Sequence, residues 1–593
     1  MTAATHAVEH SSLDDIDAEL AAMMQRLSAL LAAPPLTDAG FVELAAIFDN
    51  VAYVFLYLES NAVHVDYRRV LPWRDRFFRD RDLDDRLRSA LLGLRCTDPD
   101  IEQARRAYLD RLVQRGDDTQ DNSDAELERL NDKAKALLAD AENRHGELAR
   151  RLRVGRPGRR VWPAYYRLLS QTADAEIRVK LNAAWVRTRD QDLDALADTV
   201  NELVRIRQAR AAANGYATAL DNTLTRCRVD RPAVDSLLDD YLRRAVASHV
   251  ALDKHVRDTL GADSGGVADH FGRYAALLGR GTIIPLVDLN ASLRCLATVA
   301  RRLLGLELTT VPTTSPHVIV VTVALGGREV GRVNFDLWDS SERPRGANTT
   351  RGIRNRTDAA GIVQQPVAYV SCRFNRAGAG AGRVNFQNAH SLFHEFGHAV
   401  NHLLIRRRLP SESGLEYLPL ERLENLSMWF EKWVYHPVLA EHLNLNSDEA
   451  RGLAFAQHVK LLEYRRTHLE RGVTAALDVL VHGDPGMGVQ EAYARLDARY
   501  GLAGNCTLGD VLGSFTWPMF QANPGAYFAY LWGAADSAAR FAPFRSLTLD
   551  KCPNAAVVRA GFKDCFDFDA PSPPPDVAAL FDFYDTPVGG TAQ

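Results

Sequence analysis

Apolar residues recur at helical spacing along most of the N-terminal half of the chain. Over residues 13–31, leucine, isoleucine and methionine occupy every third or fourth position, which is the pattern of an amphipathic helix. Polar residues with glycine or proline interrupt the pattern at 114–124 and 151–163, and such clusters are typical of loops. We therefore expect a helical lobe over residues 13–310, preceded by a disordered N-terminus at residues 1–12.

The pattern changes where two runs rich in valine and isoleucine flank Gly326 and Gly327 within residues 311–338. This arrangement predicts a β-hairpin. A second strand is expected at residues 367–374, VAYVSCRF, where Tyr369 and Ser371 alternate with apolar residues. The alternation is typical of an edge or half-buried strand.

Two further stretches lie beside these strands. Residues 340–356 contain five arginines and are either a solvated loop or a basic rim on a substrate groove. The segment AGAGAGR, residues 377–383, lacks the strand and helix that a nucleotide-binding loop requires, so we expect a connecting loop. Helical spacing returns after residue 388, which makes the fold mainly α, with a small β element before the helix at 391–404.

Composition and charge exclude several classes of protein. The chain has 593 residues, 46% of them hydrophobic, and a net charge of −5, so it is globular and gives no reason to expect nucleic acid or a membrane as partner. Seven cysteines without a CxxC pair indicate a reducing compartment. The start lacks the pattern of a signal peptide, and no later apolar run approaches about 18 residues, so the sequence predicts a soluble cytoplasmic protein.

The stretch SLFHEFGHAVNHLL, residues 391–404, combines an apolar helical stripe with candidate metal ligands. His394 and His398 are four residues apart, which places both imidazoles on one helix face within reach of a single Zn²⁺. Glu395 lies beside them and can take a proton from a metal-bound water. Chance would give an HExxH about 0.03 times in such a chain. We expect His402 to be exposed or capped rather than a third ligand.

A catalytic zinc site needs a third protein ligand. The helical segment 418–437 offers Glu421, Glu424 and Glu431, and spacing alone does not choose among them. Two structural interpretations therefore remain at this point, a zinc site and a helix whose histidines are hydrogen-bonded inside the protein.

The chain resembles the thimet oligopeptidase and oligoendopeptidase F family of zinc metallopeptidases, as a divergent member. FHEFGHAVNH (393–402) matches the active helix of the family, and LENLSMWFEKW (423–433) matches its second helix. The resemblance implies that Glu424 is the third ligand of one Zn²⁺ and that Glu431 orients a ligand. The similarity covers roughly residues 310–545.

The resemblance also implies a fold and a way of binding substrate. The family is mainly α and two-lobed, with a deep central channel and zinc on its floor, which would make residues 311–593 the catalytic lobe. Peptides bind there in extended form against an edge strand. We assign that strand to 367–374, with Tyr369 and Ser371 as substrate contacts.

The sequence departs from the family at residues 513–532, where the family has a histidine followed by tyrosines that stabilise the oxyanion and hold the substrate. Tyr527 and Tyr530 match this pattern. Trp517 stands where the histidine is expected, and Asn523 stands near the first expected tyrosine. We expect Trp517 and Asn523 to contact substrate. Losing one oxyanion donor typically costs about 10²–10³ in kcat.

The sequence thus predicts a zinc-dependent endopeptidase that hydrolyses short unstructured peptides through a zinc-bound water. Glu395 would be the general base, and Tyr530, with Tyr527, would stabilise the oxyanion. One alternative is a specialised metallohydrolase that acts on one dedicated peptide or amide. The other is a catalytically weakened, zinc-containing peptide-binding protein, although such a binder has no need of Glu395.

Overall fold

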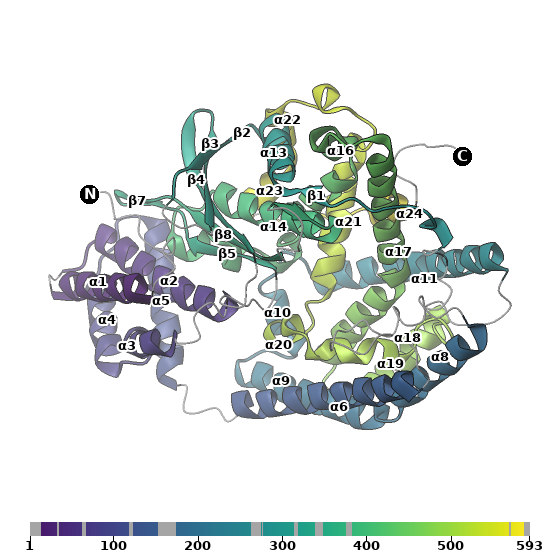
Figure 1. Ribbon diagram of the computed structural model, residues 1–593. Coiled ribbons are helices and arrows are strands. Elements are labelled where there is room, and N and C mark those ends of the chain that lie inside the picture. Colours follow the sequence, from purple (N-terminus) through teal and green to yellow (C-terminus); the bar gives the residue numbers. More distant parts are fainter. Residues whose placement is uncertain are drawn as a thin grey trace. The chain divides into compact units, whose positions relative to one another are not determined.

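The structure, a computed structural model, describes residues 13–32, 35–61, 67–117, 123–151, 174–261, 274, 277–313, 318–338, 348–374, 382–568 and 571–585 (Figure 1). The expected disordered N-terminus, most of AGAGAGR and residues 152–163 lie outside these ranges. The chain forms two compact units. Unit 1 comprises Met1–Gln120, Leu286–Asn444 and Pro543–Ala570, and unit 2 comprises Asp121–Pro285, Leu445–Ala542 and Pro571–Gln593. The sequence predicts a single boundary near residue 310, whereas each unit contains segments from both sides of that residue.

Unit 1 consists of helices around a five-stranded sheet. Its helices are α1 (Leu13–Ala32), α2 (Asp38–Asn61), η1 (Tyr67–Val70), α3 (Leu71–Phe78), α4 (Arg81–Gly93), α5 (Pro99–Asp117), α13 (Leu289–Val299), η2 (Ala300–Leu304), α14 (Phe386–Leu404), η3 (Pro410–Glu412), η4 (Leu415–Tyr417), η5 (Leu420–Arg422), α15 (Asn425–Lys432), η6 (Trp433–Tyr435), α16 (Pro437–Leu443), η9 (Leu549–Lys551), α22 (Ala555–Gly561) and α23 (Lys563–Phe566).

Helix α2 is the core helix of the N-terminal part of unit 1. Its segment Asp38–Leu58 is apolar and long enough to span a bilayer, with a hydropathy of 1.6, which corrects the expectation that no apolar run approaches that length. Of the 18 residues of this segment over which the hydropathy is averaged, 78% are buried inside the protein. There Phe41, Phe48 and Phe55 pack in one hydrophobic cluster with residues of α1, α3, α4 and α5. The hydrophobicity of α2 therefore serves the core.

The main sheet of unit 1 has the order β2-β3-β4-β8-β5. Its strands are β2 (Leu306–Val311), β3 (Val318–Leu325), β4 (Arg328–Trp338), β5 (Thr349–Arg354) and β8 (Val367–Phe374); two small sheets pair β1 (Val287–Asp288) with β9 (Arg383–Val384), and β6 (Thr357–Ala359) with β7 (Ile362–Gln364). The predicted hairpin is confirmed, since β3 and β4 are antiparallel. Gly326 and Gly327 have φ of 59° and 76°, as a two-residue turn of this type requires.

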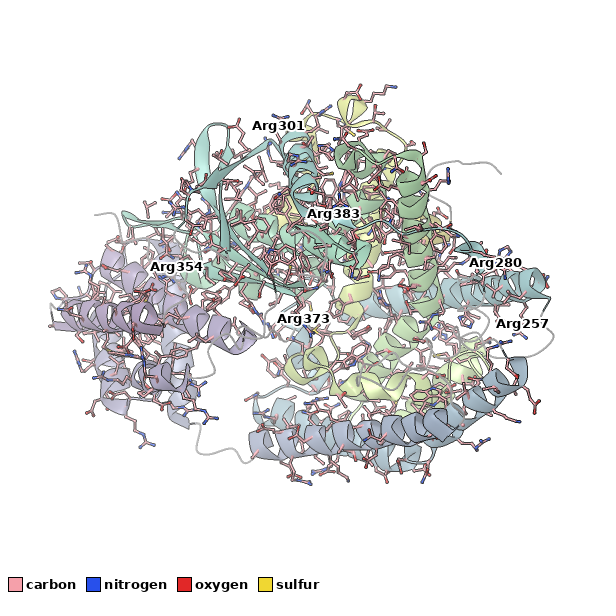
Figure 2. The ribbon with its side chains drawn as sticks, in the orientation of Figure 1. Arg257, Arg280, Arg301, Arg354, Arg373 and Arg383 are labelled. Atoms are coloured by element: carbon pink, nitrogen blue, oxygen red, sulfur yellow. The ribbon has the colours of Figure 1, made fainter. Side chains whose placement is uncertain are left out.

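Strand β8 is not an edge strand, so that prediction is wrong. It lies between β4, to which it runs parallel, and β5, to which it runs antiparallel. The strand order could not be inferred from the sequence because β5 falls within the arginine-rich segment 340–356. That segment was expected to be a solvated loop or a basic rim on a substrate groove. Arg351 of this segment pairs with Glu416 at 3.2 Å. Arg354, which is labelled in Figure 2, pairs with Glu19.

Helix α14 packs on β4, β5 and β8 and on helix α15. The side chain of Asn385 caps α14 by accepting a hydrogen bond from the backbone N–H of Asn388, which fixes where the helix begins. A Cβ atom at Gly397 would lie 2.5 Å from the backbone Cα of Ser427 and 2.6 Å from the carbonyl oxygen of Leu426. Glycine at this position therefore permits the close approach of α15 to α14.

Unit 2 is helical in the part that the structure describes, and the helix α17 contacts several of the others. Its helices are α6 (Ser123–Arg151), α8 (Ala175–Asp190), α9 (Leu193–Ala213), α10 (Ala219–Leu224), α11 (Arg231–Leu260), α17 (Ser447–Gly483), α18 (Val489–Tyr500), α19 (Leu508–Val511), η7 (Leu512–Thr516), α20 (Pro518–Ala522), α21 (Phe528–Phe541) and α24 (Val577–Asp585), and η8 (Ala542–Phe544) links α21 to unit 1. The prediction of a mainly α fold with a small β element before the histidine helix is confirmed.

Candidate metal centre and tyrosine cluster

Three side chains of unit 1 form a cluster suited to a metal ion. His394 and His398 on α14 and Glu424, directly before α15, offer ligand atoms that all lie within 4.8 Å of one another. The Oε2 atom of Glu424 lies 3.4 Å from Nε2 of His394 and 3.4 Å from Nε2 of His398. Bonds of about 2.0–2.2 Å to a tetrahedral zinc put neighbouring ligand atoms roughly 3.3–3.5 Å apart. The donor set and its spacing therefore fit zinc.

Glu431 and His390 hold the first of these histidines in place. The Oε2 atom of Glu431 lies 3.1 Å from Nδ1 of His394, and its Oε1 atom lies 3.1 Å from Nε2 of His390. Because a carboxylate only accepts hydrogen bonds, Nδ1 of His394 carries a proton, and Nε2 is the nitrogen that can bind a metal once its own proton is displaced. Glu431 thus contacts His394, and its role in orienting a metal ligand stays a prediction.

The charges of the cluster shift the pKa values of its members. Burial opposes a charge on His394, but the hydrogen bond to Glu431 and the nearby carboxylates raise its pKa to about 9. Burial acts to raise the pKa of Glu424, yet His398, His394 and Ser427 together lower it to about 2. The pKa of Glu431 is well below its ordinary value, because His390 and His394 outweigh its burial. The cluster therefore keeps its carboxylates ionised, as metal ligands must be.

Glu395 is buried beside the cluster and is held by a residue of the sheet. Glu395 is 6% exposed. The hydroxyl of Thr350 on β5 lies 2.8 Å from the Oε2 atom of Glu395 and 2.9 Å from its backbone carbonyl oxygen. The hydroxyl can donate to either oxygen. One carboxylate oxygen of Glu395 is thus held by β5.

His402 is buried rather than exposed, so that part of the sequence analysis is wrong. His402 is 0% exposed, and its Nε2 atom donates a hydrogen bond to the carbonyl oxygen of Arg354 at 2.7 Å. Burial is the main reason why the pKa of the His402 imidazole is lowered to about 4. A Cβ atom at Gly352 would lie 2.4 Å from the His402 ring. His402 therefore supports the packing of β5 on α14.

The expected substrate contacts on β8 are inside unit 1. Tyr369 has 2% and Ser371 1% exposure. The Tyr369 hydroxyl donates to Oδ2 of Asp336 at 2.8 Å and accepts from the hydroxyl of Tyr57 on α2 at 3.4 Å. Their contact with substrate was inferred from an edge position that β8 does not have. The edge next to Glu395 is instead β5.

Tyr527 and Tyr530 belong to unit 2, where they form an aromatic cluster with Phe520 and Trp517. The ring of Tyr527 stacks on Phe520 at 5.1 Å and lies 5.4 Å from Tyr530 and 6.1 Å from Trp517. Trp517 is 49% exposed. Tyr527 is buried, and its burial raises the pKa of the phenol. Three of the four predicted residues of this region, Trp517, Tyr527 and Tyr530, thus belong to one aromatic cluster in which Trp517 is exposed.

A buried carboxylate fixes the loop that carries Tyr527. Asp478 on α17 accepts hydrogen bonds from the backbone N–H groups of Gly525 and Tyr527, each at 3.0 Å, and lies 2.9 Å from Nδ1 of His482. Gly525 has a φ of 81°, a conformation that favours glycine. Asn523, two residues earlier, accepts a hydrogen bond from Arg226 at 2.5 Å. The loop is therefore held at both ends.

Sequence reasoning missed three residues of these sites. His390 continues the four-residue spacing of His394 and His398 backward by one turn, so its place on the same helix face could have been read from the sequence. Thr350 carries no such signal, because β5 meets α14 only in the folded chain. Asp478 lies far from Tyr527 in sequence and likewise has no local signal.

Several known proteins are similar to this chain in sequence or in fold. Oligopeptidase A of Salmonella typhimurium is 24% identical over 274 residues, which are 43% of this chain and 40% of that protein. Oligopeptidase A of Escherichia coli is 25% identical over 224 residues, 36% of this chain and 33% of its own. The matches thus span less than half of these relatives. A solved structure of Pz peptidase A with an inhibitor shares the fold, with a TM-score of 0.51 and 12% identity over 97% of this chain and 94% of that chain.

The sequence profile described as Peptidase family M3 matches residues 168–549. This range covers more than half of the chain and includes the histidine cluster, Thr350 and the tyrosine cluster. The chain belongs to Peptidase family M3.

Proposed function

We propose that the protein is a zinc-dependent endopeptidase that hydrolyses short unstructured peptides. The observation that carries the proposal is the cluster of His394, His398 and Glu424, whose donor atoms have the spacing of a zinc site, with the buried Glu395 beside it. Membership of family M3 and the oligopeptidase relatives support the peptide as substrate. We also expect a soluble protein, since the one helix in the described part of the chain that is long and apolar enough to span a bilayer is largely buried.

His394, His398 and Glu424 would hold the metal, and Glu431 fixes the tautomer of His394. A bound zinc supplies a Lewis acid and lowers the pKa of water to near neutrality. Glu395 is the general base in this proposal: it takes a proton from water and returns it to the leaving amine. Thr350 holds one oxygen of that carboxylate, so the other oxygen keeps a constant direction through both proton transfers.

The edge of the main sheet is the expected docking strand for the peptide backbone. β5 pairs with β8 on one side, and its residue Thr350 touches Glu395. A peptide that adds to this edge would be extended and would pass the general base. We therefore assign the docking strand to β5 in place of β8, whose residues Tyr369 and Ser371 were the expected substrate contacts.

Tyr530 and Tyr527 are the proposed donors to the oxyanion, and Trp517 and Asn523 are proposed substrate contacts. Support comes from their common aromatic cluster and from the buried Asp478 that fixes the loop of Tyr527. Phenol and indole groups are suitable hydrogen-bond donors to a developing negative charge. A large exposed indole at position 517 also favours a narrower second candidate, a metallohydrolase dedicated to one peptide or amide.

The decisive test compares wild-type protein with Glu395→Gln in a mixture of peptides of about 5 to 20 residues. We expect wild-type protein to cleave internal bonds of many peptides, and the variant to retain one zinc per chain but lose turnover. Mass spectrometry identifies the products, and atomic absorption measures the zinc. Full activity of Glu395→Gln would refute the mechanism. Cleavage of a single peptide would select the dedicated hydrolase, and binding without cleavage would select a peptide-binding protein.

A further inference from the structure

A cavity of about 250 Å³ lies in unit 1, at the C-terminal end of α14. All the residues that line it belong to unit 1, and none of them belongs to the histidine cluster. Part of the lining is apolar and includes the buried residues Leu404, Ile405 and Phe566. The charged part consists of four arginines and one carboxylate, namely Arg356, Arg406, Arg408, Arg559 and Asp358. The cavity therefore has an excess of positive charge.

The positive charge of the lining is largely unpaired. Of the four arginines, only Arg408 forms an ion pair with a described residue, and its Nη1 atom lies 3.8 Å from Oδ2 of Asp98. Burial lowers the pKa of Arg356, and the attraction of Asp358 offsets this effect only in part. Like charges around one cavity repel each other, and removing them from water adds to the cost. An anion bound in the cavity would offset both costs.

Two of the guanidinium groups are held in place by backbone carbonyl groups. Arg356 donates from Nη2 to the carbonyl oxygens of Leu403 at 3.1 Å and Val330 at 3.3 Å. Arg559 donates from Nη1 to the carbonyl oxygen of Leu304 at 2.5 Å. A guanidinium has five N–H donors, so each arginine keeps donors beyond these bonds. Because the two side chains are already ordered, a ligand that binds them loses less conformational entropy.

We propose that this cavity binds a small phosphate monoester with a compact apolar or aromatic group. Planar guanidinium groups match the oxygens of a phosphate, which carries nearly two negative charges at neutral pH. The apolar part of the lining would contact the rest of the ligand. A volume of about 250 Å³ lies below the range of about 300–1,000 Å³ that is typical of drug-sized ligands, which favours a small molecule. The site includes neither Glu395 nor a proposed metal ligand, so it is independent of the proposed function.

Isothermal titration calorimetry of the full-length protein tests the site with phenyl phosphate, benzoate and benzyl alcohol, which share an aromatic ring and differ in charge. We expect phenyl phosphate to bind with a Kd below about 1 mM. Benzoate should bind about tenfold more weakly because it has fewer charged acceptors, and benzyl alcohol should not bind measurably. Absence of phenyl phosphate binding would overturn the proposal. So would equal binding of benzyl alcohol, or tighter binding of benzoate than of phenyl phosphate.

Substitutions in the lining locate the bound anion. Arg406→Gln is the main variant, because the Arg406 side chain is exposed and has no hydrogen bond or ion pair with a described residue. It should lower the affinity for phenyl phosphate about five- to tenfold. The matched control is Arg407→Gln, since the guanidinium of Arg407 lies 5.0 Å from the ring centroid of Phe568 and the residue does not line the cavity. Unchanged affinity in Arg406→Gln, or an equal loss in both variants, would overturn the proposal.

Asp358→Asn gives a result that damage to the fold cannot imitate. It removes the one carboxylate of the lining, so the affinity for phenyl phosphate should rise. An affinity that stays the same or falls in this variant would contradict binding among the four arginines.

Phosphate groups also coordinate zinc, so Glu424→Gln separates the cavity from the histidine cluster. This variant should bind phenyl phosphate as the wild-type protein does. Binding that is lost in Glu424→Gln and retained in Arg406→Gln would place the anion at the histidine cluster and overturn the proposal. Because the measurement is binding, failure of the protein to cleave peptides would refute the proposed function and leave the phosphate site intact.

Discussion

The histidine cluster of unit 1 and the tyrosine cluster of unit 2 are built in different ways. His394, His398, Glu424 and Glu431 come from two helices that pack closely through Gly397, and every carboxylate among them contacts a histidine. Trp517, Tyr527 and Tyr530 come from one short segment, and an exposed indole replaces the histidine that the family resemblance leads one to expect. The proposed metal ligands match the pattern that the family resemblance implies, whereas the proposed substrate contacts depart from it. The proposed function therefore predicts an unchanged hydrolytic step and a different choice of substrate.

The largest expected effect is that of Glu424→Gln. Replacing the carboxylate ligand with an amide removes the negative charge between His394 and His398, and the loss of one protein ligand should lower zinc affinity by orders of magnitude. Peptide hydrolysis should fall to background. The measurement is zinc content after dialysis together with turnover. Glu421→Gln is the matched control in the same segment, and equal zinc loss in both variants would contradict the assignment of Glu424.

The second effect concerns the tyrosine cluster. Tyr530→Phe should lower kcat by about 10²–10³ with little change in KM, because a donor to the oxyanion acts mainly in the transition state. Tyr527→Phe is expected to cost less, since Tyr527 is the more buried of the two. Steady-state kinetics on one fluorogenic peptide measures both. A loss confined to KM would instead make these tyrosines substrate contacts.

The different outcomes of the sequence analysis have physical causes. His394, His398 and Glu395 share one helix, so their spacing fixes their geometry, and Glu424 and Glu431 followed from the family pattern on the next helix. The position of β8 inside the sheet could not be read from VAYVSCRF, because β5, TTRGIR, contains two arginines and a glycine and has no clear strand alternation. His402 was expected to be exposed or capped, and its burial could not be inferred because its partner, the carbonyl oxygen of Arg354, lies 48 residues away.

The third prediction is a pH dependence of zinc affinity. The pKa of His394 in the metal-free protein is raised to about 9, so the imidazole is protonated below that pH, and zinc must displace this proton. Affinity should therefore fall about tenfold for each pH unit below 9. Glu431→Gln removes the main cause of the raised pKa, so the decline should begin at a lower pH. Competition with a chromophoric chelator, corrected for its own titration, measures both. Affinity that does not change between pH 9 and 7 would contradict the prediction.

The smallest effect tests how β5 contributes to the histidine cluster. Thr350→Val keeps the shape of the side chain and removes the hydroxyl that holds Glu395. A hydrogen bond to a charged group contributes about 1.5–3 kcal/mol, of which only the part that orients the carboxylate should affect the rate, so we expect kcat to fall about five- to tenfold while KM and zinc content stay the same. Thr350→Ser should restore most of kcat, because serine keeps the donor. If serine fails to restore kcat while zinc content is normal, Thr350 acts through packing of β5 on α14 rather than through its hydroxyl.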